Sequence, residues 1–138
     1  MQIEDASTCD ALLTLDDLRQ YTVTVEPALR SQYRNRVILG APLPCVGSTQ
    51  LALMLNIADV QQSRVDHNVA LHRRVERFKT SFVARRMLGD SSSARSVVER
   101  VLSPSSATQC AAMIDDDKVT IPSSYKSVWD RGTTHISG

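Results

Sequence analysis

The residues best placed to do chemistry together form a basic run at positions 72–86, HRRVERFKTSFVARR. The run carries seven cationic side chains, counting a protonatable His72, and one acid, Glu76. An ordinary solvated helix face would contain more acids, paired with bases three or four positions away. Because one acid cannot balance seven cations, we interpret the run as a surface for an anionic ligand, which would relieve the repulsion and release counterions.

A helical wheel predicts which side of this run is buried. An apolar stripe at spacings of four, three and four is expected to face the core: Leu71, Val75, Phe78 and Phe82. Arg73 and Arg77 would then point to solvent. The candidate nucleic-acid-binding residues are Arg73, Arg74, Arg77, Arg85 and Arg86. No aromatic residues alternate with them on the predicted outer face, so contact would be to phosphate and independent of sequence. Two alternatives stay open: an acidic protein surface as the ligand, and a simply solvated helix.

Three consecutive carboxylates, Asp115, Asp116 and Asp117, form a second candidate site. If assembly packed them against acids of a neighbouring copy, their pKa values would rise and acid would favour assembly. Calcium would then replace the protons at neutral pH. The three acids lack the spaced ligands of a dedicated calcium loop, so a solvated turn is the alternative.

Catalytic and metal-binding patterns are weak in this sequence. The five glycines form no phosphate-binding loop, and His67 and His72 are five positions apart, where metal ligation on a helix prefers three or four. Cys110 and His135 could be drawn as a nucleophile and its base, with no local support. We therefore expect no metal, no cofactor and no catalytic residue, and a small metal- or thiol-dependent enzyme is only a third alternative.

Charge is distributed unevenly, although the formal net charge is +1. Residues 1–26 hold six acids and one arginine, whereas residues 27–102 hold twelve cations and five acids. Opposed blocks of this kind favour association between copies of the chain. The thirteen arginines against three lysines favour interfaces, because arginine binds phosphate and carboxylate through two parallel hydrogen bonds. Biased codon usage would give the same excess.

Length and composition fit one domain with a real hydrophobic core, at 138 residues and 42% hydrophobic side chains. We divide it into an acidic arm (1–26), a basic helical body (27–102) and a C-terminal tail (103–138). Three widely spaced cysteines, an acidic N-terminus without a signal peptide and the lack of a long apolar run predict an intracellular, reducing location and no membrane partner.

Helical periodicity predicts an all-α fold, a bundle of four to five helices with an irregular, extended C-terminal tail. The helices are expected over residues 7–20, 26–39, 48–89, 90–102 and, more weakly, 105–114. A break is expected near residues 66–68, where Asp66 or Asn68 could cap a new helix. The alternating stretch YTVTV (21–25) could be a short strand.

Two short segments resemble the coat proteins of rod-shaped, tobamovirus-like plant RNA viruses. ALRSQY (28–33) resembles a segment near their first helix, and SSYKSVW (123–129) resembles one near their C-terminus. The resemblance implies a four-helix bundle that stacks around single-stranded RNA. It would place Ala28, Gln32 and Tyr33 in the first helix, and Tyr125, Val128 and Trp129 in the C-terminal packing. The chain lacks the aromatic-rich belt of that family.

Taken together, these patterns predict a non-enzymatic, self-assembling structural protein that binds nucleic-acid phosphate without sequence specificity. A viral coat or nucleocapsid subunit is the form we expect, with copies of itself and RNA as partners and the virion as a further location. The alternative is a helical adaptor or ribonucleoprotein subunit whose basic helix binds an acidic protein surface.

Overall fold

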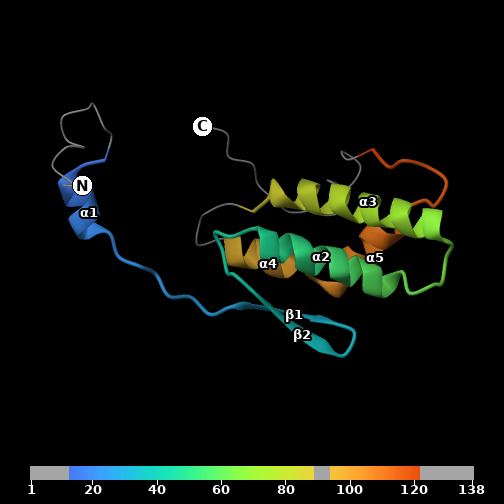
Figure 1. Cartoon of the computed structure of the whole chain (residues 1–138), viewed down its shortest axis with the longest axis horizontal. Helices are drawn as coiled ribbons and strands as arrows, with labels where there is room; N and C mark the ends of the chain where they lie inside the picture. The colour runs from blue at the N-terminus through green and yellow to red at the C-terminus, as the bar shows by residue number, and fades with distance from the viewer. Residues whose placement is uncertain (1–12, 89–93, 122–138) are drawn as a thin grey trace.

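The computed structural model of the chain describes residues 13–88 and 94–121. In chain order the elements are α1 (Leu15–Gln20), β1 (Leu29–Tyr33), β2 (Arg36–Gly40), α2 (Gly47–Val60), α3 (His67–Arg85), α4 (Ala94–Val101) and α5 (Pro104–Ala112). Helices α3 and α5 pack against α2, and the two-stranded sheet lies beside it through β1 (Figure 1). The prediction of an all-α bundle is therefore wrong, because the fold combines helices with a two-stranded sheet.

The β-hairpin lies where the sequence predicted a helix over residues 26–39. The strands are antiparallel, with Leu29 opposite Gly40 and Tyr33 opposite Arg36. Arg34 in the two-residue turn has a φ of 53°, the positive value that such tight hairpin turns require. Alternate residues of β1 are partly buried and exposed, because one face of the strand packs against α2. The coat-protein resemblance of ALRSQY is thus not matched by a helix.

The N-terminal part of the described chain departs from the helical body. Helix α1 is shorter than the predicted 7–20, and Thr14 and Asp17 cap it reciprocally in a capping box. Residues 7–12 of that prediction lie outside the described residues. The following segment, which includes the predicted strand 21–25, is exposed and pairs with no strand among the described residues. Figure 1 shows α1 set apart from the other helices, at the far end of this segment.

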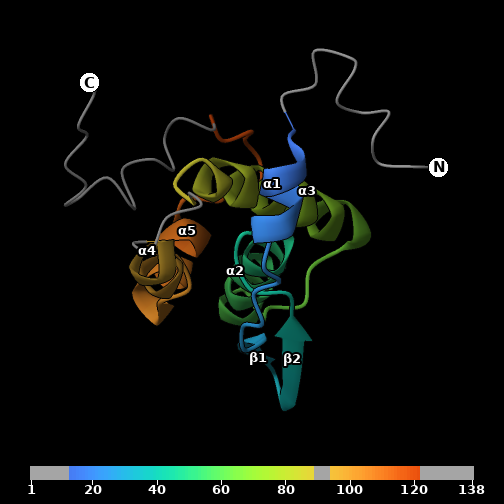
Figure 2. The ribbon, with the colours of Figure 1, turned by 90° about the vertical axis from the view of Figure 1, so that its left-hand side faces the viewer.

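The predicted break in the long helical tract is confirmed. Helix α2 ends at Val60, and α3 begins after Asp66, whose carboxylate accepts hydrogen bonds from the backbone N–H groups of Asn68 and Val69. The connection lets α3 fold back against α2. Figure 2, which looks along the helices, shows α2 between α3 on one side and the hairpin on the other, with α4 and α5 beside it.

The hydrophobic core lies between α2, α3, α4 and α5 and is built from small aliphatic residues. Its buried members are Leu53, Ile57, Val83, Ala84, Val101, Ala107, Cys110 and Ile114. Helix α2 contributes Leu53 and Ile57, the two largest side chains of the core that are fully buried. No helix in the described ranges is long and apolar enough to cross a membrane.

The prediction for the buried side of α3 is wrong. All four members of the apolar stripe are about half exposed: Leu71 50%, Val75 49%, Phe78 48% and Phe82 55%. The opposite side is buried instead, at Glu76, Thr80, Ser81, Val83 and Ala84. Small residues allow α3 to approach α2 closely. Burial of the polar ones is tolerated because Thr80 and Ser81 donate their hydroxyls to carbonyls of their own helix.

Candidate functional site

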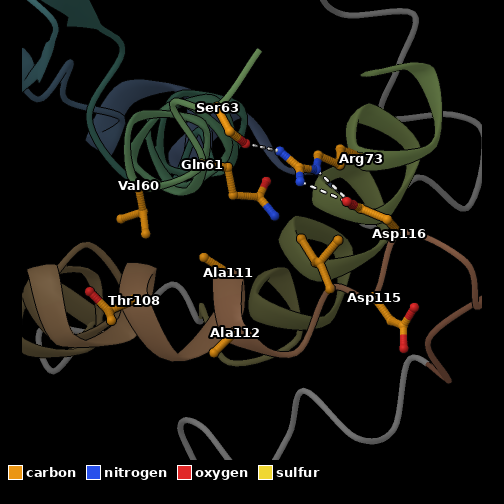
Figure 3. A pocket seen from close by; sticks show the side chains of 10 residues that line it. Val60, Gln61, Ser63, Arg73, Thr108, Ala111, Ala112, Asp115 and Asp116 are labelled. Carbon is orange, nitrogen blue, oxygen red and sulfur yellow. Dashed lines mark hydrogen bonds and ion pairs between the residues drawn. The ribbon is translucent and has the colours of Figure 1, made fainter. Parts of the chain in front are cut away.

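The candidate site lies on the polar side of α3, where the segment that follows α5 (residues 113–121) runs past it. Arg73 clamps Asp116 through two hydrogen bonds, Nε to Oδ1 at 2.7 Å and Nη2 to Oδ2 at 2.8 Å. The third guanidinium nitrogen donates to Ser63 Oγ at 2.9 Å (Figure 3). One arginine thus joins α3 to the 113–121 segment and to the connection that follows α2.

The clamp changes the ionisation of both partners. The hydrogen bond from Arg73 lowers the pKa of Asp116 below its ordinary value of 3.8 and outweighs desolvation. The same bond raises the pKa of Arg73. The Arg73 side chain is only 13% exposed, so its predicted position, pointing away from the body, is wrong. The charge of Asp116 is offset by a residue 43 positions away in sequence.

Two further contacts hold the 113–121 segment against α3. The Nε2 atom of His72 is 2.9 Å from the carbonyl oxygen of Asp115. Glu76 is buried, and its carboxylate accepts a hydrogen bond of 2.7 Å from Lys79. Burial favours a higher pKa for Glu76, but hydrogen bonds with Lys79 and Thr120 together lower it. The segment is therefore anchored at residues 72, 73 and 76, along the first half of α3.

Arg77 also lies on this side of α3, contrary to the wheel prediction. Its Nε donates to the side-chain oxygen of Gln61 at 3.0 Å, next to the C-terminal end of α2. Burial, followed by the nearby charge of Arg73, lowers the pKa of Arg77. A second cation thus ties α3 to the end of α2, through a neutral amide.

An open pocket of about 420 Å³ lies beside the clamp, between α2, α3 and α5. Val60, Gln61 and Ser63 line one wall, and Arg73 and Asp116 close one end (Figure 3). The opposite wall is small and apolar: Thr108, Ala111, Ala112 and Ile114, followed by Asp115. Since the charges of Arg73 and Asp116 neutralise each other, the pocket offers a short ion pair beside an apolar wall.

The remaining predicted site residues are not brought together. Arg74, Arg85 and Arg86 are exposed, as are Asp115 and Asp117. Asp115 Oδ1 accepts the backbone N–H of Asp117 in a local turn. The structure itself does not test the predicted phosphate-binding role of the five arginines or the predicted assembly role of the three carboxylates.

Sequence reasoning missed Glu76, Gln61 and Ser63 as parts of the network. The spacing of three between Glu76 and Lys79 was a usable signal, because residues three apart meet on one side of a helix. Gln61 and Ser63 had no such signal, since their partners come from another element.

Thiol and metal chemistry find no support in the described part of the chain. Burial raises the pKa of the Cys110 thiol to about 12, so it stays protonated and is a poor nucleophile near neutral pH. Cys45 is exposed, while Cys9 and His135 lie outside the described residues. Residues 13–88 and 94–121 hold no group of three histidines, cysteines or acids that could bind a metal.

Comparison with known proteins identifies a family model and several relatives that match this chain. The family model described as Gamma-glutamyltranspeptidase matches residues 2–137. Glutathione hydrolase 2 of Arabidopsis thaliana is 33% identical over 144 residues, which cover 98% of this chain and 25% of the relative. Glutathione hydrolase 3 of the same plant is 28% identical and covers 97% of this chain and 22% of the relative. The chain thus spans about a quarter of the length of these relatives.

Solved structures agree on the fold. Gamma-glutamyltranspeptidase of Helicobacter pylori gives a TM-score of 0.74 at 22% identity, covering 87% of this chain and 36% of that one. The enzyme of Pseudomonas nitroreducens, complexed with L-DON, gives the same TM-score at 23% identity, covering 88% and 38%. At these identities the likeness shows the fold alone.

These matches overturn the functional predictions made from the sequence. None of them is a coat protein, so the resemblance to rod-shaped plant viruses and the expected capsid role are wrong. The relatives are glutathione hydrolases and transpeptidases, which are enzymes, so the expectation of a non-enzymatic protein is also wrong. The predicted partners, RNA and copies of the chain, are therefore wrong as well. The alternative of a helical adaptor is wrong for the same reason.

Proposed function

The chain belongs to the gamma-glutamyltranspeptidase family, and on that premise we propose that it forms part of an enzyme that hydrolyses glutathione or transfers its γ-glutamyl group. The observation that carries the proposal is the family match, which runs through residues 2–137. The names of the two plant relatives support glutathione as the substrate.

Within such an enzyme, residues 13–88 and 94–121 serve as a framework. Their hydrophobic core is well buried, and Arg73 and Asp116 at the pocket are paired with each other. Amide hydrolysis needs an activated nucleophile and a base within hydrogen-bonding reach. The thiol of Cys110 does not meet this requirement, because its pKa is raised. The framework would hold the reacting groups of the enzyme in place.

The proposal is tested with a chimera. The 144-residue stretch of Arabidopsis Glutathione hydrolase 2 that matches this chain is replaced by residues 1–138, and release of glutamate from glutathione is measured. We expect a rate within about tenfold of the parent, because an altered packing contact worth about 1.4 kcal/mol changes a rate about tenfold.

A matched control keeps this experiment interpretable. The same chimera with Leu53→Asp, a charge placed at a fully buried position, should lose both the folded structure and the activity. The proposed function would be contradicted by a chimera that has the same melting temperature as the parent enzyme but releases no glutamate.

A further inference from the structure

Arg77 fixes the orientation of the Gln61 amide at the pocket between α2, α3 and α5. Arg77 Nε donates to Gln61 Oε1 at 3.0 Å. A guanidinium group carries only donors, so the amide oxygen must face Arg77 and the amide nitrogen, Nε2, is the free end. Figure 3 shows the Gln61 side chain projecting from the end of α2 into the space between Arg73 and Ala111. Nε2 has no acceptor among the described residues, so this donor is available to a ligand.

A second donor lies on the same wall of the pocket. Ser63 Oγ accepts a hydrogen bond of 2.9 Å from Arg73, which leaves the hydroxyl hydrogen of Ser63 available to donate. At the end of the pocket, each carboxylate oxygen of Asp116 already accepts a hydrogen bond from Arg73, at 2.7 and 2.8 Å. Two donors on one wall, beside acceptors that are already engaged, favour a ligand that brings acceptor oxygens of its own.

The charge behind these donors is positive. Arg73 and Asp116 neutralise each other, but the hydrogen-bond partner of Arg77 is the neutral amide of Gln61. Arg73 and Arg74 add like charge near Arg77. Hydrogen bonds to an ionised acceptor are shorter and about twice as strong as those to a neutral one. A carboxylate is therefore favoured over a neutral carbonyl group at this wall.

One acid that lines the pocket could oppose an anionic ligand. Asp115 is exposed, and its Oδ1 accepts the backbone N–H of Asp117 at 2.9 Å. Figure 3 shows the carboxylate of Asp115 turned away from Gln61. Because salt screens exposed charges, Asp115 opposes an anion at the Gln61 wall only weakly.

The wall opposite the donors is apolar and built from small residues. Ala111, Ala112 and Ile114 form most of it. Thr108 also lines it, and its hydroxyl is engaged because it donates to the carbonyl oxygen of Pro104 in the same helix. The volume of about 420 Å³ lies within the usual range for small-molecule sites, about 300–1,000 Å³. The pocket thus fits a ligand whose short aliphatic body lies opposite its acceptor oxygens.

We propose that this pocket binds a short aliphatic monocarboxylate. The carboxylate oxygens accept hydrogen bonds from Gln61 Nε2 and Ser63 Oγ, and the carbon chain lies against Ala111 and Ile114. The hydrogen bond from Arg77 polarises the Gln61 amide and strengthens its Nε2 donor, because hydrogen bonds in a chain reinforce one another. A free short-chain acid and the C-terminal carboxylate of a small peptide both carry this chemistry. The inference does not rest on the proposed function.

A series of small ligands tests the chemistry of the site. Proton–nitrogen NMR spectra of the full 138-residue chain report the Gln61 side-chain amide and the backbone amides of Ala111 and Ala112. Butyrate, added at constant ionic strength, should shift these signals to saturation with a dissociation constant of about 1 mM, as expected for so small a ligand in an open pocket. Butyramide has the same shape without the charge and should bind about tenfold more weakly. Butylammonium, a cation, should give no saturable shift.

A second carboxylate distinguishes the two sources of the ligand. N-acetylalanine presents a carboxylate on a peptide-like body and is titrated in the same way. Tighter binding of butyrate would assign the pocket to a free acid, and tighter binding of N-acetylalanine would assign it to a peptide terminus. Both results support the proposal, because both place a carboxylate at the Gln61 wall.

Two matched variants test the residue that carries the proposal. Gln61→Glu keeps the shape of the side chain and an acceptor for Arg77, but it removes the Nε2 donor and adds a negative charge. It should weaken butyrate binding about tenfold or more, because like charges at short range repel. Gln62→Glu makes the same chemical change at the next position, which does not line the pocket, and should keep the dissociation constant within about twofold.

Several results would overturn the proposal. One is the lack of a saturable shift with either carboxylate, and another is butyramide or butylammonium binding as tightly as butyrate. A Gln61→Glu chain with a well-dispersed spectrum and wild-type affinity would also overturn it, as would an equal loss in Gln62→Glu. If Gln61→Glu does not fold, the ligand series on the wild-type chain decides alone. Glutamate release is not measured in these titrations, so failure of this inference and failure of the proposed function are told apart.

Discussion

Arg73 shows how a single partner decides where a charged side chain lies. A wheel based on apolar residues placed it toward solvent, but the structure turns it inward onto Asp116 and Ser63. A largely buried cation is tolerated when it is paired, and Arg73 is paired with Asp116 and also donates a hydrogen bond to Ser63. The carboxylate lies 43 residues away, so no local pattern in the sequence revealed the pair.

The clamp predicts how stability responds to acid. The pKa of Asp116 is lower in the folded chain than its ordinary 3.8, so the folded state holds fewer protons than the unfolded state between the two values. The stabilisation is therefore fully present above pH 3.8 and is lost as the pH falls through the lowered value. In Asp116→Asn, the free energy of unfolding should be smaller at pH 6 and should fall less steeply below pH 4 than in wild type.

Urea unfolding from pH 2.5 to 6 measures this difference. Asp117→Asn removes a carboxylate that makes no ion pair within the described ranges and serves as the control for lost charge. Parallel acid profiles for wild type and Asp116→Asn would show that the clamp does not contribute to stability.

At the scale of elements, features that depend on local sequence were predicted correctly, whereas features that depend on tertiary contacts were not. The break between α2 and α3 was predicted near residues 66–68, with Asp66 and Asn68 as candidate caps, and the side chain of Asp66 does cap α3. The hairpin was missed because residues 26–39 contain both helical and alternating patterns, and contact of β1 with α2 decides between them. A strand over residues 21–25 was predicted from alternation alone, but no partner strand exists for it in the described structure.

The cap of α3 makes a prediction at this scale. Asp66 accepts two backbone hydrogen bonds, at 2.8 Å from Asn68 and 3.1 Å from Val69. Asp66→Ala should lower the free energy of unfolding by about 1 kcal/mol, the usual effect of losing an N-cap. Asp66→Ser keeps a hydrogen-bond acceptor and should recover most of the free energy of unfolding that Asp66→Ala loses. Chemical denaturation followed by circular dichroism measures both, and equal stability of Asp66→Ala and wild type would contradict the role of the cap.

For the whole molecule, composition predicted a single hydrophobic core. The other sequence patterns predicted the wrong fold class and the wrong function. The arginine excess and the opposed charge blocks suggested a polyanion, but Arg73 and Arg77 serve internal contacts. The enzymatic class was not predictable from motifs, because the described residues hold no metal cluster and Cys110 is a buried, protonated thiol. Family membership became visible only when the whole pattern of residues 2–137 was compared with other proteins.

The distance in sequence between Arg73 and Asp116 has a consequence for the order of folding. Closing a loop of 43 residues costs more chain entropy than closing the tight turn of the hairpin, so local contacts should form first and the clamp last. Arg73→Ala should then leave the refolding rate nearly unchanged and speed unfolding. Stopped-flow fluorescence or circular dichroism measures both rates, and a slower refolding rate would place the clamp in the folding nucleus. The 113–121 segment would thus act as a latch that closes on an already assembled body.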